Sequence, residues 1–178
     1  DQIIYKFSAL EEQANPQVVG TVTATDVDGK QYGKILFSIK PGANASMFEI
    51  DPISGEITLK RRGLDRDCDD CEREFHLTVQ AADCLVDCSV EVEVTVTLDD
   101  VNDNAPIFSA AEFKLGVPEN GRETLTLAPG SIAIYANDPD SGENASLQYD
   151  LVGVGAQLFK LVVDDAGHVN IVPKNNLE

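Results

Sequence analysis

Alternating apolar and polar residues mark two long strands in this chain. In the stretch 75–81 the odd positions are apolar, and in the stretch 90–98 the even positions are apolar. A period of two places every second side chain on one face, so both stretches predict strands with one buried face and neither fits a helix. Shorter strands are expected around Val18–Ala24, Ile35–Ile39 and Glu56–Leu59, separated by Asp-Gly, Pro-Gly and Ser-Gly turn signals. Many short strands at regular spacing predict a sandwich or a barrel.

The same pattern of residues recurs later in the chain. Phe48-Glu49-Ile50 returns as Phe159-Lys160-Leu161, an offset of about 110 residues that exceeds the period of a solenoid repeat. Each copy is therefore expected to be a domain with its own core. We place the first repeat at 1–99, a linker at 100–106 and a second, incomplete repeat at 107–178. The second copy would lack its last two strands, so we expect a segment of a longer tandem array.

The charge balance narrows the classes of partner. The chain has 31 Asp and Glu against 13 Lys and Arg, a formal net charge of −18, which argues against binding to nucleic acid phosphates. An acidic surface can serve solubility alone. The alternative is that carboxylates converge on a hard cation such as calcium, which takes six to eight oxygen ligands. No apolar run approaches the roughly 20 residues of a membrane helix, so any membrane anchor is expected outside this chain.

The linker between the two copies is rich in oxygen-bearing side chains. In Asp99-Asp100-Val101-Asn102-Asp103-Asn104 every residue except Val101 carries one, and Pro106 restricts the backbone just after it. A turn rich in Asn and Asp is common between strands, so the linker alone does not establish a metal site. Three further acidic clusters favour one: Glu11, the run Leu64-Asp65-Arg66-Asp67, and the pair Asp138-Pro139-Asp140.

These motifs together resemble the repeats of the cadherin superfamily. The matching residues are Glu11, Leu64-Asp65-Arg66-Asp67, Ala81-Ala82-Asp83, Asp100-Val101-Asn102-Asp103-Asn104, Asp138-Pro139-Asp140 and Asn144. The resemblance covers the whole chain and is strongest to the N-terminal repeats of a protocadherin. It implies an all-β fold of tandem seven-stranded Greek-key β-sandwiches with immunoglobulin-like architecture, the second of them truncated.

The resemblance also implies about three calcium ions (Ca2+) at the junction of the repeats. The implied metal-binding residues are Glu11, Asp65, Asp67, Asp100, Val101, Asn102, Asp103, Asn104, Asp138, Asp140 and Asn144. Asp67 stands where the family usually has glutamate, which is one methylene longer. A physical argument supports cations here, because each close pair of carboxylates costs on the order of 1 to 4 kcal/mol without them.

The implied function is calcium-dependent cell–cell adhesion or recognition, by the extracellular part of a plasma-membrane protein. The implied partner is the same protein on an apposed cell, or another cadherin, and no enzymatic activity is expected. Two alternatives remain open: a heterophilic or spacer segment of a large cadherin, and an accessory glycan-binding module. The chain has no Trp, which argues against stacking on sugars and against adhesion by exchange of a Trp-anchored first strand.

The four cysteines form two pairs close in sequence. The strand from Glu74 to Ala82 separates Cys68 and Cys71 from Cys84 and Cys88, and nine extended residues span roughly 30 Å. This distance excludes a shared zinc site and both crossed pairings, because a disulfide needs Cα atoms within about 7 Å. We therefore predict the disulfides Cys68–Cys71 and Cys84–Cys88.

The remaining candidates are two glycosylation sequons and two histidines. Of the sequons that begin at Asn44 and Asn144, we expect Asn44 to be the preferred acceptor, because a glycan on Asn144 would crowd the third calcium site. His76 and His168 have no neighbouring cysteine or serine that suggests a nucleophile. Both are expected at the surface.

Overall fold

The computed structural model describes residues 4–26, 34–83, 88–116, 126–127 and 133–174, and every structural statement below refers to these ranges. The chain divides into two compact units, Asp1–Val101 and Asn102–Glu178, which we describe separately. The strands of the first unit are β1 (Ile4–Leu10), β2 (Gln17–Thr21), β3 (Leu36–Ile39), β4 (Phe48–Ile50), β5 (Glu56–Leu59), β6 (Glu74–Ala82) and β7 (Ser89–Asp99). Those of the second are β8 (Ile107–Phe108), β9 (Leu115–Gly116), β10 (Thr126–Leu127), β11 (Ala136–Asn137), β12 (Phe159–Val163) and β13 (Val169–Pro173).

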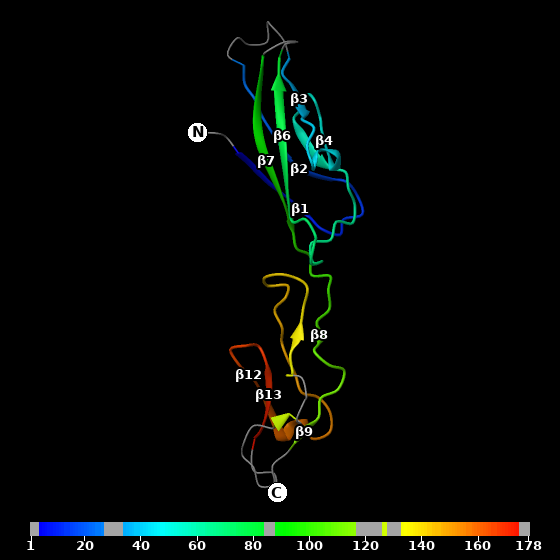
Figure 1. The fold of residues 1–178 in the computed structure, drawn as a ribbon, viewed down its shortest axis with the longest axis vertical. Coiled ribbons are helices and arrows are strands. Elements are labelled where there is room, and N and C mark those ends of the chain that lie inside the picture. The colour runs from blue at the N-terminus through cyan, green and yellow to red at the C-terminus, as the bar shows by residue number, and fades with distance from the viewer. Residues whose placement is uncertain (1–3, 27–33, 84–87, 117–125, 128–132, 175–178) are drawn as a thin grey trace. The chain divides into compact units, whose positions relative to one another are not determined.

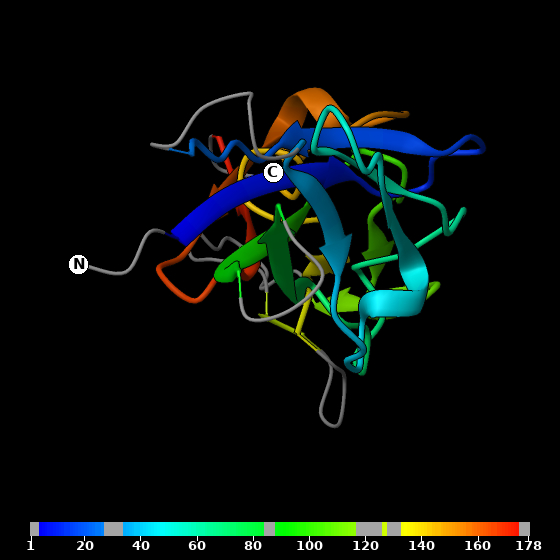
Figure 2. The same cartoon turned by 90° about the horizontal axis from the view of Figure 1, so that it is seen from above.

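The first unit is a sandwich of two sheets, as predicted (Figure 1 and Figure 2). One sheet has the strand order β1-β7-β6-β3 and the other the order β2-β5-β4. The long strands β6 and β7 are antiparallel neighbours, whereas β1 pairs with β7 in parallel, with Ile4 opposite Glu93 and Leu10 opposite Asp99. Parallel strands cannot be joined by a tight hairpin, and β1 and β7 are accordingly far apart in the sequence.

The alternation in the two long strands produces the core between the sheets. In β6 the side chains of Phe75, Leu77 and Val79 are buried, and in β7 those of Val94 and Val96 lie opposite Leu77 and Phe75. Because successive side chains point to opposite faces, one register buries all of these residues together. The predicted strand assignment is therefore confirmed for both elements.

The alternation fails at the beginning of β7. Val90 continues the apolar pattern of the even positions but is 63% exposed. Its side chain borders an open hollow of about 400 Å³ that Tyr5, Val22 and Phe37 also line. The pattern identifies the face on which a side chain lies, whereas burial also requires that other residues cover that face.

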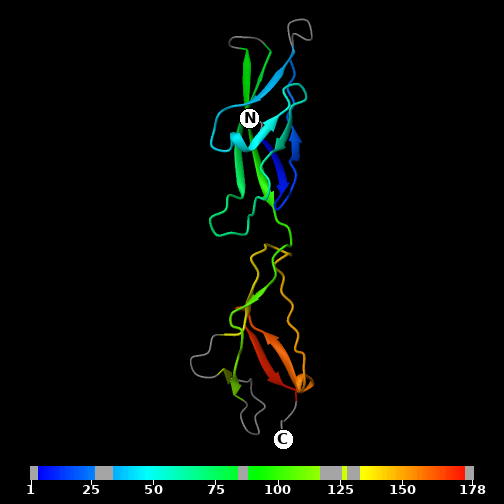
Figure 3. The same ribbon diagram turned by 90° about the vertical axis from the view of Figure 1, so that its right-hand side faces the viewer.

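The described part of the second unit contains six short strands in three antiparallel pairs, β8 with β11, β9 with β10, and β12 with β13 (Figure 3). Among the described residues of this unit, Ile134 and Val169 are buried apolar side chains, and Phe108 makes ring contacts with Phe113 and Tyr149. Apart from two short 3-10 helices, the regular secondary structure of the described residues consists of β-strands, which confirms the predicted fold class.

The internal repeat is visible in local structure as well. In the first unit a short 3-10 helix, Ala45–Met47, precedes β4, and in the second a 3-10 helix, Ala156–Leu158, precedes β12. Phe48 and Phe159 each begin the following strand, and each strand pairs with the next one in antiparallel fashion. The same sequence motif thus forms the same structure in both places.

The cysteines agree with the predicted pairing as far as the structure describes them. Cys68 and Cys71 form a disulfide with their Cα atoms 5.3 Å apart. Cys88 is disulfide-bonded too. Its predicted partner, Cys84, lies outside the described residues, so the pairing Cys84–Cys88 stays a prediction.

Candidate metal centre

The site begins with a buried carboxylate at the end of β1. Glu11 follows directly after this strand, and its backbone N–H donates to the carbonyl of Asp99, which continues the β1–β7 pairing. Its side chain is fully buried. One carboxylate oxygen accepts the backbone N–H of Arg66 at 2.7 Å and the other accepts that of Val101 at 3.0 Å. These bonds offset the cost of burying a charge, which would otherwise be large.

A loop between β5 and β6 carries the next acidic residues. The Asp65 carboxylate accepts the backbone N–H of Asp67 at 2.8 Å, an arrangement that fixes the direction of the chain at Asp67. The guanidinium of Arg66 lies 3.1 Å from the carboxylate of Asp100, and their side chains are only 18% and 10% exposed. The loop is held from the other side as well, since Arg73 Nε donates to the carbonyl of Arg66 at 2.8 Å.

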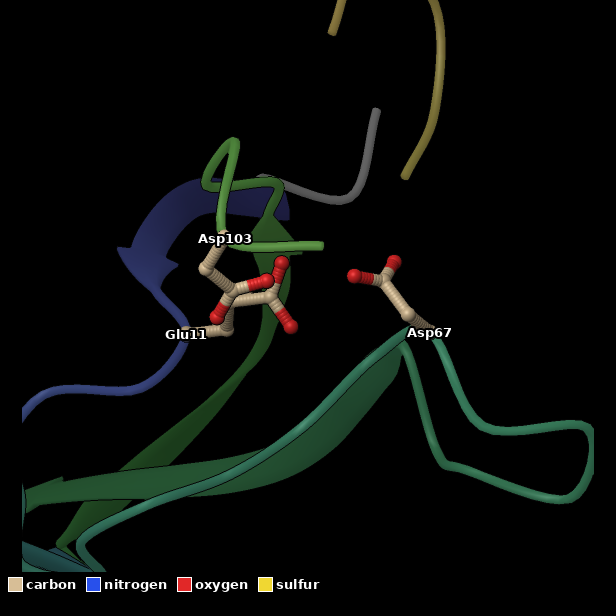
Figure 4. Close-up of side chains that lie close together, drawn as sticks. All are labelled: Glu11, Asp67 and Asp103. Carbon is tan, nitrogen blue, oxygen red and sulfur yellow. The ribbon is translucent and has the colours of Figure 1, made fainter. Parts of the chain in front are cut away.

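Three carboxylates converge at this end of the first unit. One oxygen each from Glu11, Asp67 and Asp103 lie within 4.8 Å of one another. Figure 4 shows the carboxylates of Glu11 and Asp103 beside each other, with Asp67 directed toward them from its loop. Oxygen donors in this number are the ligands that hard divalent cations prefer. The donor set therefore fits a calcium ion and offers nothing to a soft metal.

The beginning of the second unit holds another set of polar side chains. The backbone N–H of Asn104 and its side-chain amide both donate to Oδ1 of Asp140, at 3.2 and 2.8 Å. Asp138 accepts the backbone N–H of Asp140 at 3.1 Å, and the side-chain amide of Asn102 lies 3.5 Å from the carbonyl of Asn144.

The carboxylate of Asp140 is also buried. The residue is only 5% exposed, and its Oδ2 is buried without a hydrogen-bond partner among the described residues. A buried carboxylate oxygen without a partner is costly, so a cation or a hydrogen-bond donor at this position would be favourable.

The predicted ligands thus lie in two sets, each in its own unit. Glu11, Asp65, Asp67, Asp100 and Val101 belong to the first, and Asn102, Asn104, Asp138, Asp140 and Asn144 to the second. Asp103 is the residue that joins the cluster with Glu11 and Asp67. Asp67 takes part although it is one methylene shorter than the usual glutamate. The full ligand set stays a prediction.

Arg66 was named in the sequence analysis only as part of the run Leu64-Asp65-Arg66-Asp67 and was given no role in the site. Its backbone N–H binds Glu11 and its guanidinium binds Asp100, so it contacts two predicted ligands. The available signal was its position between Asp65 and Asp67, where a cation within an acidic run has neighbours of opposite charge.

The Asn44 sequon is a case where the structure opposes the expectation. Asn44 is 7% exposed, its amide nitrogen donates to the carboxylate of Glu72 at 2.9 Å, and its carbonyl oxygen accepts the backbone N–H of His76 at 3.0 Å. A glycan on that nitrogen would compete with the bond to Glu72 and would need space around a side chain that the fold buries, so we no longer expect Asn44 to be an acceptor. The His76 side chain itself is exposed, as expected.

Comparison with known proteins bears on both units. A cadherin-domain family model matches residues 5–98. Cadherin-7 from Gallus gallus is 37% identical over 150 residues, which are 80% of this chain and 18% of the relative. The chain therefore spans less than a fifth of the length of this relative. Among the described residues no helix has the length and hydropathy needed to cross a bilayer.

Two solved structures of cadherin repeats are similar to this chain. Extracellular domains 1–4 of protocadherin gamma B7 are 26% identical with a TM-score of 0.69, covering 99% of this chain and 41% of that one. Domains EC22–24 of mouse cadherin-23 are 30% identical with a TM-score of 0.67, covering 100% and 54%. From the family match, the sandwich fold and these likenesses we conclude that this chain belongs to the cadherin superfamily.

Proposed function

We propose that this segment binds calcium between its two repeats and contributes to calcium-dependent adhesion between cells, with a second copy of the same protein as the partner. The observation that carries the proposal is the convergence of Glu11, Asp67 and Asp103 within 4.8 Å. The proposal includes a first repeat at 1–99, a calcium-binding linker at 100–106 and a second repeat at 107–178. It also places the membrane anchor outside this chain.

Electrostatics explain why this cluster needs a cation. At 4.8 Å two unit charges repel by about 0.9 kcal/mol in bulk water and by about 3.5 kcal/mol at an effective dielectric constant of 20. Three carboxylates form three such pairs. A calcium ion among them replaces these repulsions with attraction, and the buried Oδ2 of Asp140 would likewise gain a partner. Glu11, Asp65, Asp67, Asp100 and Asp103 would hold ions at the base of the first repeat.

A ligand in the linker gives the proposal a mechanical consequence. Asp103 lies two residues beyond Val101, where the first unit ends. An ion bound by Glu11, Asp67 and Asp103 would tie the linker to the first repeat and restrict its motion. Calcium would then stiffen the junction, and a stiff array would present the faces of several repeats to a partner at once.

Calorimetric titration with calcium tests the binding step. We expect dissociation constants of about 10⁻⁵ to 10⁻³ M, the range of extracellular calcium modules. Asp103→Asn should weaken binding at least tenfold, whereas Glu49→Gln, on an exposed strand position, should leave it unchanged. Intact binding in Asp103→Asn would refute the site. Small-angle scattering in chelator and in millimolar calcium tests the stiffening, which an unchanged profile would refute.

The adhesion step needs a longer protein than this segment. Beads coated with the full extracellular region should aggregate in calcium and disperse in chelator. Beads of two kinds, one bearing this protein and one bearing an unrelated cadherin, should sort apart if recognition is homophilic. Aggregation that is insensitive to chelator would contradict the proposal, and binding only to a different protein would favour the heterophilic alternative.

A further inference from the structure

The Cys68–Cys71 disulfide lies next to a residue of the metal cluster. It closes a four-residue ring that begins at the residue directly after Asp67. Cys68 is exposed to solvent, as are Asp69 and Asp70 within the ring. A disulfide at an exposed position is accessible to attack by an external thiolate, unlike one in a core.

The ring lies between two sets of contacts that hold the chain segment carrying Asp67. On its N-terminal side, Asp67 is held by the Asp65 carboxylate. On the C-terminal side of the ring, Glu72 bonds to Asn44 and Arg73 to the carbonyl of Arg66. No regular helix or strand covers the residues between Leu59 and Glu74. The disulfide therefore fixes the path between Asp67 and these anchors.

We propose that Cys68–Cys71 is a thiol–disulfide exchange site whose state sets the affinity of the Glu11, Asp67 and Asp103 cluster for calcium. The inference rests on the proposed calcium binding. With the ring closed, Asp67 is held in position before the ion arrives. With the ring open, the ion must also order the loop, which lowers its affinity.

The reaction partner is a dithiol. One of its thiolates attacks Sγ of Cys68, the bond between the two protein sulfurs breaks, and Cys71 leaves as a thiolate that takes up a proton. The second thiol of the reagent then attacks the mixed disulfide, which releases Cys68 as a thiol and closes a cyclic disulfide in the reagent. The protein gains two electrons and two protons, and the dithiol loses the same.

Linkage makes the coupling reciprocal. If reduction weakens calcium binding by a given factor, calcium must oppose reduction by the same factor at saturation. A tenfold change corresponds to a shift of about 30 mV in the two-electron reduction potential. The loop-closure entropy of a ring this small limits the effect to roughly 20-fold, and we expect between roughly 3-fold and 20-fold.

The experiment uses the Cys84→Ser, Cys88→Ser variant of this segment, so that Cys68 and Cys71 are the only cysteines. Calcium is titrated calorimetrically into the oxidised protein and into the protein reduced with dithiothreitol, an uncharged dithiol. The fraction of protein with the disulfide intact is then measured at a series of ratios of reduced to oxidised dithiothreitol, once in chelator and once in calcium. We expect weaker binding after reduction and a more negative reduction potential in calcium. The Cys68→Ser, Cys71→Ser variant should bind calcium with the affinity of the chemically reduced protein, and dithiothreitol should not change that affinity.

The outcomes separate the two proposals. Equal calcium affinity in the oxidised and reduced forms, together with an unchanged reduction potential, would overturn the exchange-site inference while leaving calcium binding intact. Failure of both forms to bind calcium would overturn the proposed function itself. Circular dichroism in chelator establishes that reduction leaves the fold in place, and the reduction potential remains a test if the Cys68→Ser, Cys71→Ser variant does not fold.

Discussion

Neutralising Asp67 should change the stability of the first repeat in opposite directions with and without calcium. Asp67→Asn keeps the size of the side chain and removes one of three charges that lie within 4.8 Å of one another. At that distance each pair costs about 0.9 kcal/mol in water and about 3.5 kcal/mol at an effective dielectric constant of 20. Because Asp67 is half-buried and Asp103 exposed, the lower end applies. We expect a gain of about 1 to 2 kcal/mol in chelator.

In calcium the same substitution should be destabilising. An ion that binds only the folded state stabilises it by RT ln(1 + [L]/Kd), so a 10-fold to 100-fold loss of affinity at saturation removes about 1.4 to 2.7 kcal/mol. The gain of about 1 to 2 kcal/mol without the ion opposes this loss. A loss of affinity near 100-fold therefore leaves the wild-type protein the more stable of the two in saturating calcium, by about 1 kcal/mol, and the less stable in chelator. Asp67→Glu is the matched control, because it keeps the charge and restores the length that the family usually has.

Urea unfolding followed by circular dichroism measures both effects. The unfolding midpoint of Asp67→Asn should move up in chelator and down in calcium, relative to the wild type, with an unchanged slope. A shift in the same direction under both conditions would mean that Asp67 acts through packing or hydrogen bonds. The reasoning from charge would then be wrong.

Three further predictions follow from other positions. Gly55→Ala should lower the free energy of unfolding, measured in urea, by about 2 kcal/mol or more, because Gly55 has φ of 74° and a Cβ there would collide with the carbonyl oxygen of Val22. An unchanged free energy of unfolding would contradict the turn geometry. Mass spectrometry of protein secreted from mammalian cells should find Asn44 without a glycan, and Asn44→Ala should lose about 1 to 3 kcal/mol with its two hydrogen bonds; an occupied site in folded protein would refute this. The backbone N–H groups of Ser54 and Ile53 hold the pKa of Asp51 below its ordinary value. The stabilisation from Asp51 is therefore fully present above the ordinary carboxyl pKa and is lost as the pH falls through the lowered pKa. An NMR titration midpoint of Asp51 at or above the ordinary value would contradict this prediction.

Much of the architecture can be predicted from the sequence because its signals are local. The alternation along 75–81 and 90–98 assigns side chains to faces of a strand, whatever the strand pairs with. The repeated Phe motif before β4 and β12 predicts the same local structure twice, and the structure has it in both places. Four cysteines in two close pairs limit their own pairing by distance alone, and Cys68–Cys71 is confirmed.

Tertiary structure decides what depends on partners far apart in the chain. Glu11 is 55 residues from Arg66 and 90 from Val101. The parallel pairing of β1 with β7 brings its carboxylate to Val101, and the backbone bond from Glu12 to Leu64 brings the loop of Arg66 to it. Asn44 has an acceptor sequon in sequence, yet the fold directs its amide onto Glu72. Sequence periodicity determines the face of a strand on which a residue lies, but burial, ion pairing and the approach of carboxylates depend on the opposing surface, which the fold alone supplies.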